Sequence, residues 1–144
     1  MNIEALCEKY LEKKDIFYVF LDLPEFWEVR ADGLNGAIYN KDEKVAMIYF
    51  KAPIDLRFVD RVEWLNETKD VYKIDYYGDF GYAYCQACME NGQVVTKSYF
   101  SPQYEERILL NYSNGVVTVF DGGKISKLFS SEDEFMKHYN EIFK

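Results

Sequence analysis

The sequence is poor in the side chains from which metal and redox sites are built. It has three cysteines and one histidine in 144 residues. A tetrahedral zinc site needs four ligands, and beyond the pair Cys85-x-x-Cys88 only Cys7 and His138 are at hand. The pair is expected late in a strand, where the two thiols face opposite ways, and not at the helix N-terminus that activates a redox thiol. We therefore predict no metal and no other cofactor.

Catalytic groups are equally scarce. A Ser or Cys nucleophile would need the single histidine, His138, as its base. His138 lies beside apolar residues of a predicted C-terminal helix, which favours a place at the surface or at the helix end. The sequence also has neither a G-x-G-x-x-G loop between strand and helix nor a Walker-type loop, so no nucleotide site is predicted. Catalysis is the less favoured hypothesis.

Long apolar runs and basic clusters are missing as well. No stretch approaches the roughly 18 consecutive apolar residues of a membrane span, and Glu4, Glu8 and Glu12 interrupt the segment where a signal peptide would be apolar. The net charge is −8, with 17 basic and 25 acidic residues, and no basic stripe is present to contact phosphates. We expect a cytoplasmic protein that binds neither nucleic acid nor membranes directly and that suits a basic protein partner. The oligomeric state is not predicted.

The residues that are abundant indicate a sheet. Aromatic side chains make up 18% of the sequence and include 13 tyrosines, and aromatics are common in strands. Turn residues that accept a positive φ separate the apolar stretches at Asn91-Gly92, Asn114-Gly115 and Asp121-Gly122-Gly123. Sequential pairing across such turns predicts an antiparallel meander with strands at Val71–Tyr77, Phe80–Met89, Gln93–Phe100, Ile108–Tyr112, Val116–Phe120 and Lys124–Phe129.

Helical spacing marks both ends of the chain. Apolar residues between Asn2 and Lys14 recur at the i, i+3, i+4 and i+7 positions of one helical face. Ser131 and Glu134 have the spacing of a capping box. They are followed by a second apolar helical face made of Phe135, Met136, Tyr139, Ile142 and Phe143. We predict a helix at each end.

The remaining segments predict two strand regions and one helix. Ile16–Leu23 is a run of β-branched and aromatic residues, which is typical of a strand. Ala37–Tyr39 and Lys44–Lys51 predict a hairpin. Leu56–Asn66 places apolar residues on a broad helical face and predicts a middle helix. A strand is the alternative there, because even spacing also holds for Phe58, Val62 and Trp64.

Together these elements predict an α+β fold in one domain, residues 1–144. An antiparallel meandering sheet would carry the N- and C-terminal helices on one face, and the fold would also contain the middle helix. A face of small side chains lets helices approach closely, so we expect them against Gly81, Ala83, Cys85 and Ala87. The aromatic face of the same strand would then lie opposite, with Phe80, Tyr82 and Tyr84.

Negative charge and tyrosines coincide between Asp70 and Glu106, where six acids accompany two bases. Tyrosine anchors with complementary charge are common at specific interfaces. We predict a protein-binding module of the inhibitory, immunity or phage-encoded antagonist type. The C-terminal strand, the Ser-Ser-Glu-Asp-Glu-Phe segment and the short helix resemble small bacterial immunity proteins. The acidic, Tyr-rich surface that would bind the basic partner consists of Tyr76, Tyr77, Asp79, Tyr82 and Tyr84.

The alternative is a small hydrolase or small-ligand binder with an aromatic pocket. Asp75 and Asp79 lie among aromatic residues, and sugar-cleaving sites combine two carboxylates with a stacking ring. Turn chemistry beside Gly78 also explains Asp79 without catalysis. An enclosed cavity holding a carboxylate of raised pKa would favour the enzyme, whereas a shallow patch would favour the binding module.

Overall fold

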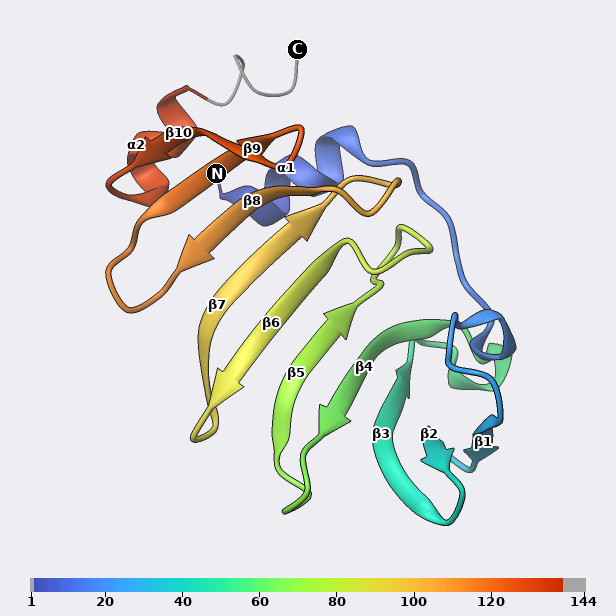
Figure 1. Ribbon diagram of the computed structural model, residues 1–144. Coiled ribbons are helices and arrows are strands. Elements are labelled where there is room, and N and C mark those ends of the chain that lie inside the picture. The colour runs from blue at the N-terminus through green and yellow to red at the C-terminus, as the bar shows by residue number, and fades with distance from the viewer. Residues whose placement is uncertain (1, 139–144) are drawn as a thin grey trace.

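A single sheet of ten antiparallel strands dominates the computed structural model, which describes residues 2–138 (Figure 1). Each strand pairs with the next one along the chain, so the predicted antiparallel meander is confirmed and the fold is mostly β. The strands are β1 (Trp27–Asp32), β2 (Asn35–Asn40), β3 (Glu43–Phe50), β4 (Val59–Leu65), β5 (Val71–Tyr76), β6 (Cys85–Glu90), β7 (Gln93–Phe100), β8 (Glu106–Asn111), β9 (Val117–Asp121) and β10 (Lys124–Phe129).

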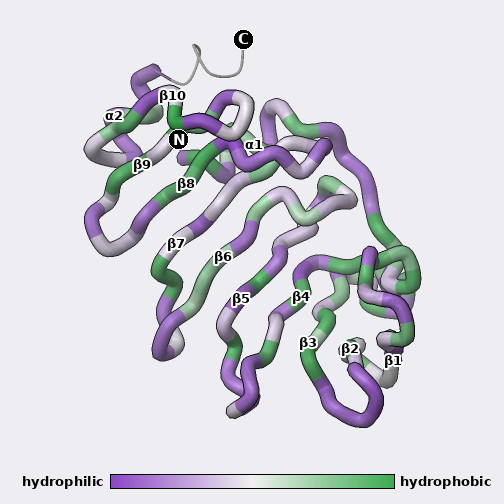
Figure 2. Tube along the Cα trace, in the orientation of Figure 1, coloured by the Kyte–Doolittle hydropathy of each residue, from purple (hydrophilic) through white to green (hydrophobic). Residues whose placement is uncertain are grey.

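Tight turns produce this order because each one brings the next strand beside the last. Asn91 and Gly92, between β6 and β7, have φ values of 52° and 76°. Gly122 and Gly123, between β9 and β10, have φ values of 59° and 81°. Two-residue hairpin turns require such positive φ values. Figure 2 shows that the turns joining β2 to β3 and β6 to β7 are mainly hydrophilic.

Two short helices, α1 (Ile3–Tyr10) and α2 (Glu132–Lys137), confirm the predicted terminal helices. The Asn2 side chain accepts a hydrogen bond from the Ala5 amide at 2.9 Å. The Ser131 hydroxyl accepts one from the Glu134 amide at 3.1 Å. Both side chains are N-caps. Three of the apolar positions predicted for the C-terminal helix lie outside the described residues, namely Tyr139, Ile142 and Phe143.

The predicted middle helix over Leu56–Asn66 is wrong. Ile54–Leu56 forms a single 3₁₀ turn, η2, and the segment then continues as β4 between β3 and β5. The register between β3 and β4 shifts at Asp60, which is an extra residue of a β-bulge. The bulge places Val59 and Val62 on the same buried side, three residues apart, and this spacing imitates a helix.

The strand predicted over Ile16–Leu23 is also wrong. The segment contains a 3₁₀ turn, η1 (Tyr18–Phe20), and touches the sheet through one isolated bridge between Phe17 and Phe58. Backbone pairing is limited to the start of β4, where the Val59 amide donates to the Ile16 carbonyl at 2.9 Å, because β5 pairs with β4 only from Arg61 onward. The rest of the segment packs over the sheet. Leu21 is buried in this contact.

The strand predicted from Phe80 begins only at Cys85, the first residue of β6. Gly81 has a φ of 75°, and a Cβ there would lie 2.9 Å from Cγ of Lys14, so the chain makes a glycine-dependent loop. The rings of Phe80 and Tyr84 pack edge to face with centroids 4.6 Å apart. Both are buried in the same core as the helices, so the expected aromatic face opposite the helices is wrong for these residues.

The two terminal helices share one core with the C-terminal half of the sheet. Ile3 and Leu6 from α1 and Phe135 from α2 are buried together with strand residues such as Tyr99 and Ile108. Packing of both helices on one face is therefore confirmed, and Figure 1 shows them beside β8, β9 and β10. A second core lies between the 16–23 segment and β1–β4, with Leu21, Ile38, Ile48, Phe50 and Val62.

The two cores lie on opposite faces of the same sheet. Residues in register across neighbouring strands share a face. One cross-strand row consists of Tyr49, Arg61, Tyr76, Cys85, Tyr99 and Ile108, and only its last three residues are buried in the helix-covered core. The adjacent row faces the other way and consists of Ile48, Val62, Asp75, Gln86, Ser98 and Leu109.

Only the first two residues of that second row belong to the core under the 16–23 segment. Within the described residues, each half of the sheet therefore buries one face and leaves the other outside both cores. We call the uncovered face of β1–β5, which carries Tyr49 and Arg61, the first open face. The uncovered face of β5–β9, which carries Asp75 and Gln86, is the second open face.

Removing the Phe135 ring should destabilise the protein strongly, because that ring is 0% exposed and holds α2 on the sheet. We expect Phe135→Ala to lower the free energy of unfolding by about 3–5 kcal/mol. The matched control is Phe20→Ala, at a ring that is 73% exposed. Chemical denaturation of both variants checks the difference, and equal losses would contradict the described packing of α2.

Candidate functional site

The five residues predicted to bind a partner do not lie on one surface. Tyr76 packs at the margin of the helix-covered core, whereas Tyr77 packs against the other core. Tyr84 is buried. Tyr82 is half-buried and its hydroxyl donates to the Phe100 carbonyl at 2.9 Å, while Asp79 is exposed. Their joint role in partner binding stays a prediction.

The buried tyrosines form a polar contact with α1. The Tyr84 and Tyr99 hydroxyls donate to the two carboxylate oxygens of Glu4 at 3.0 and 3.1 Å. Burial, together with the Glu4 carboxylate, raises the pKa of both phenols, so they stay protonated as donors. This contact fixes the helix on the sheet and satisfies buried polar groups.

Asp79 also has a structural partner. Its carboxylate lies 2.8 Å from Nζ of Lys51, which also pairs with Asp15. The hydrogen bond from Lys51 lowers the pKa of Asp79. The pair joins the loop before β6 to the end of β3. Asp79 is thus an ionised anchor and not a proton donor of raised pKa.

Asp75, the other member of the predicted carboxylate pair, lies on the second open face. One carboxylate oxygen accepts from Nε1 of Trp64 and the other from Nε2 of Gln86, both at 2.9 Å. Beside it is an open hollow of about 310 Å³ lined by Asp22, Asp75, Tyr77, Ala83, Gln86, Phe100 and Tyr104. Asp79 is not among these residues, so the two carboxylates do not converge as a hydrolase pair would require.

The first open face carries a feature that sequence reasoning missed. The Arg30 guanidinium lies 4.1 Å from the ring centre of Tyr39, and that of Arg61 lies 4.0 Å from the ring centre of Tyr49. None of the four belongs to either core. We call these residues of β1–β4 the arginine–tyrosine stripe. The sequence signal that could have revealed it is the alternation of side chains along a strand. Tyr39 and Tyr49 directly follow the buried residues Ile38 and Ile48 and therefore point to the opposite face.

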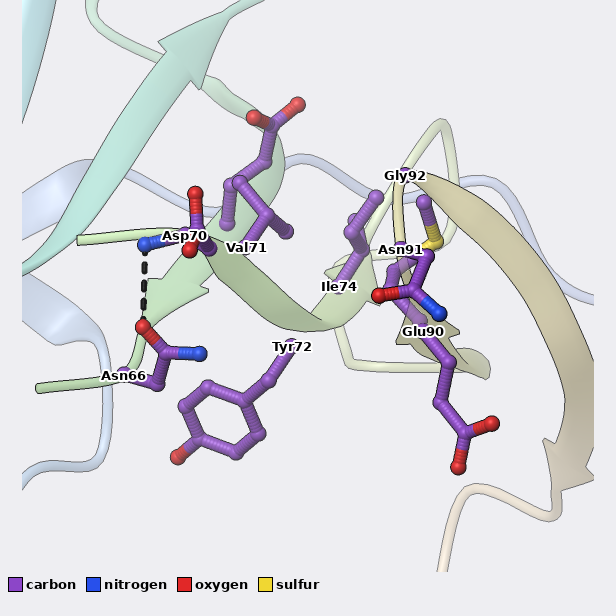
Figure 3. Close-up of a pocket in the computed structure, with 10 residues that line it drawn as sticks. Asn66, Asp70, Val71, Tyr72, Ile74, Glu90, Asn91 and Gly92 are labelled. Carbon is purple, nitrogen blue, oxygen red and sulfur yellow. Dashed lines mark hydrogen bonds between the residues drawn. The ribbon is translucent and has the colours of Figure 1, made fainter. Parts of the chain in front are cut away.

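The stripe continues into an open pocket of about 850 Å³ at the β4–β5 and β6–β7 turns (Figure 3). Nε of Arg61 donates to Glu63 at 2.9 Å, and Glu63 is one of the lining residues. Asp70 and Glu90 add further carboxylates, and the Tyr72 ring lies beside them. Among the described residues that line the pocket, three have acidic side chains and none has a basic one, so this end of the first open face carries negative charge.

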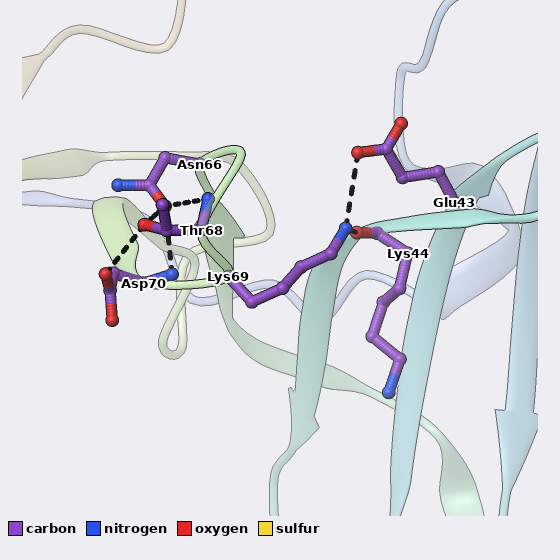
Figure 4. A network of polar contacts seen from close by, with 6 residues as sticks. All are labelled: Glu43, Lys44, Asn66, Thr68, Lys69 and Asp70. Atoms are coloured by element: carbon purple, nitrogen blue, oxygen red, sulfur yellow. Dashed lines mark hydrogen bonds and ion pairs between the residues drawn. The ribbon is translucent and has the colours of Figure 1, made fainter.

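A polar network orders the turn that borders this pocket (Figure 4). The Asn66 side chain accepts from the amides of Thr68 and Asp70 at 3.0 and 2.9 Å. Nζ of Lys69 donates to the Lys44 carbonyl at 2.8 Å and so ties the turn to β3. Local hydrogen bonds therefore hold this wall of the pocket in place.

The thiols of the C-x-x-C pair have different surroundings. Cys85 is buried and Cys88 is exposed, and burial raises the pKa of Cys85 to about 12. Burial also raises the pKa of Cys7 to about 12. Within residues 2–138, no three His, Cys, Asp or Glu side chains are grouped so that they could hold a metal ion. In the same part of the chain, no helix is long and apolar enough to cross a membrane.

These features define a class of protein, a β-meander domain built on a single ten-stranded antiparallel sheet with broad faces. Comparison with known proteins makes the assignment specific. Residues 27–130, from the start of β1 to just beyond β10, match the family described as the GtfB middle domain. The chain belongs to this family.

Curated relatives agree with the family assignment. The chain is 25% identical over 136 residues to the UDP-N-acetylglucosamine–peptide N-acetylglucosaminyltransferase stabilizing protein GtfB of Streptococcus parasanguinis, covering 94% of this chain and 31% of that protein. It is 31% identical over 132 residues to the protein of the same name from Limosilactobacillus reuteri, covering 90% and 29%. The chain thus spans about a third of the length of the curated relatives it matches.

Solved structures share the fold. A chain of a GtfA/B complex bound to UDP and GlcNAc superimposes with a TM-score of 0.79 at 21% identity, over 90% of this chain and 29% of that one. A chain of the accessory secretory protein 1, 2 and 3 structure from Streptococcus pneumoniae gives 0.72 at 12%, over 96% and 29%. The pneumococcal O-GlcNAc transferase GtfA with UDP and GlcNAc gives 0.51 at 10%, over 97% and 25%.

The predicted inhibitory, immunity or antagonist function is wrong, because residues 27–130 match the GtfB middle domain and the curated relatives are named as stabilizing proteins of a peptide N-acetylglucosaminyltransferase. The hydrolase or small-ligand alternative is overturned by the same match. Protein binding and the antiparallel sheet remain consistent with the family. Net charge and tyrosine content, on which the prediction depended, describe an interface in general and do not identify its partner.

Thiol reactivity should separate Cys88 from the two buried cysteines. At pH 8 a thiol of pKa about 12 is ionised to only about one part in 10⁴, and the thiolate is the nucleophile. We expect one thiol to react quickly with a soluble disulfide reagent in the native protein and all three to react in denaturant. Cys88→Ser should abolish the fast phase, and a fast phase that survives in that variant would contradict the burial described.

Proposed function

We propose that this chain is the sheet domain through which a GtfB-type stabilizing protein binds its peptide N-acetylglucosaminyltransferase. The observation that carries the proposal is the match of residues 27–130 to the GtfB middle domain, because that range contains all ten strands. The names of the relatives supply the partner, since each is a stabilizing protein for such a transferase. A solved GtfA/B complex containing a chain of the same fold agrees with this.

The arginine–tyrosine stripe supports the first open face as the contact surface. Tyrosine and arginine are enriched at interface centres, where their large side chains bury much area at small entropic cost. In the stripe, each guanidinium stacks on a ring, so the side chains of Arg61 and Tyr49 are already ordered before binding. A preordered surface loses less conformational entropy on association.

Charge adds a second preference. The pocket of Figure 3 joins the stripe through Arg61 and Glu63 and is lined by three acids. Together with the net charge of −8, this favours a transferase surface that presents basic side chains to Glu63, Asp70 and Glu90. The part of the partner opposite the stripe itself would present acidic or apolar groups to Arg30 and Arg61.

Truncating the stripe should weaken the complex. We expect the double variant Tyr49→Ala/Arg61→Ala to bind the transferase at least about tenfold more weakly than the unchanged protein, which is about 1.4 kcal/mol. The measurement is the dissociation constant of the complex by calorimetry, together with the thermal stability of the transferase in the mixture.

The matched control is Arg57→Ala. The Arg57 guanidinium also lies over a ring, 5.2 Å from the centre of Phe50, but that ring belongs to the core on the other side of the sheet. Circular dichroism is used to check that both variants fold. Absence of any complex with the unchanged protein would refute the proposed function. A complex that the stripe variant leaves intact would remove the first open face as the contact surface.

A further inference from the structure

A second hollow lies away from the stripe, between α1 and the β7–β8 hairpin. Its volume is about 390 Å³. Most of its wall is apolar or aromatic, and Arg107 is the only charged residue among the described residues that line it. The lining residues are Leu6, Cys7, Tyr10, Leu11, Tyr99, Phe100, Ser101, Pro102, Arg107 and Ile108.

Arg107 differs from the other three arginines of the sequence. Arg30 and Arg61 each donate to carboxylates, and Arg57 donates to the Gly33 carbonyl at 2.9 Å. Within the described residues, Nε of Arg107 is buried and has no hydrogen-bond partner. A buried donor without an acceptor is unfavourable, so an acceptor that reaches this half-buried guanidinium would be bound favourably.

Nearby acids do not fill this role. The Glu4 carboxylate already accepts hydrogen bonds from Tyr84 and Tyr99. Glu105 and Glu106 precede Arg107 directly, yet neither carboxylate is among the ion pairs formed within residues 2–138. Among the described residues, Nε of Arg107 therefore has no acceptor, and a carboxylate is the group best matched to its guanidinium.

We propose that this hollow binds an apolar side chain of a protein partner that has a carboxylate beside it, with the carboxylate held by Arg107. The identification of this partner as the transferase rests on the proposed function. The guanidinium fork matches a carboxylate, with two parallel hydrogen bonds. The hollow's own rings and aliphatic groups would surround the apolar side chain. A polyanion such as nucleic acid does not fit this hollow, because binding its phosphates requires several basic side chains close together.

The Cys7 thiol forms part of the wall and is not a reacting group. Burial raises its pKa to about 12, so it remains a neutral, weakly polar surface near neutral pH. Leu6 from α1, Leu11 directly after that helix and Ile108 from β8 complete the apolar sides. Among the described lining residues, the hollow therefore offers one charge, at Arg107, in a mostly apolar surface, which favours ligands that combine a single negative charge with an apolar body.

The first test uses a pair of small probes that differ only in charge. 4-Phenylbutyrate carries a carboxylate on an apolar body, and 4-phenylbutyramide has the same body without charge. We expect the carboxylate to shift the ¹⁵N side-chain signal of Arg107 saturably and to bind at least fivefold more tightly than the amide. Arg107→Gln should abolish this preference, whereas Arg57→Gln should keep it. Equal binding of the two probes, or no shift at Arg107, would overturn the inference.

The second test uses the transferase. We expect Arg107→Glu to weaken the complex at least tenfold, because the new carboxylate repels the one it should bind, while the matched variant Arg57→Glu leaves the affinity within twofold. Unchanged affinity in Arg107→Glu, with the Tyr49→Ala/Arg61→Ala variant still impaired, would overturn this inference and leave the proposed function standing. If the unchanged protein forms no complex with the transferase, the proposed function fails, and so does the assignment of the transferase as the partner of the hollow. The preference of the hollow for a carboxylate is then decided by the small probes alone.

Discussion

One continuous sheet buries opposite faces in its two halves, and the remaining features of the molecule follow from this constraint. The row Tyr49, Arg61, Tyr76, Cys85 and Tyr99 stays in register across five strands, yet it passes from an uncovered face to the core under α1. A strand can satisfy the hydrophobic effect by burying either of its faces. Here β1–β4 bury one face of the sheet and β6–β9 bury the opposite face. The strand β5 lies at the boundary between the two halves.

The arrangement requires two separate covers. The helices α1 and α2 cover the C-terminal half, with Phe135 as the fully buried anchor of α2. The 16–23 segment covers the other side of the N-terminal half through Leu21. Each cover leaves the opposite face of its half outside the cores, so the domain presents sheet surface on both sides. Broad faces with ordered side chains, such as Arg61 stacked on Tyr49, suit protein association better than enclosed chemistry.

A feature of this structure is predictable from the sequence when the contacts that form it are local in the chain, and is missed when they join distant residues. The β6–β7 hairpin is predictable because Asn91 and Gly92 supply the two positive φ values within the turn itself. The middle helix is mispredicted because the bulge at Asp60 depends on pairing with β3, and it gives Val59 and Val62 a helical spacing. The five residues predicted as a partner-binding site lie on different surfaces for a related reason: Tyr84 reaches Glu4 across 80 residues of sequence, a contact that no local pattern contains.

By itself, the sequence determined the antiparallel meander and the two capped terminal helices, because turn residues and N-caps act over two to four positions. It also contains only three cysteines and one histidine. Only the tertiary structure decided which face of each strand is buried, which tyrosines become core and which form the stripe. The physical reason is that burial depends on the cover that folds over each half of the sheet, and those covers contact strands distant in the chain.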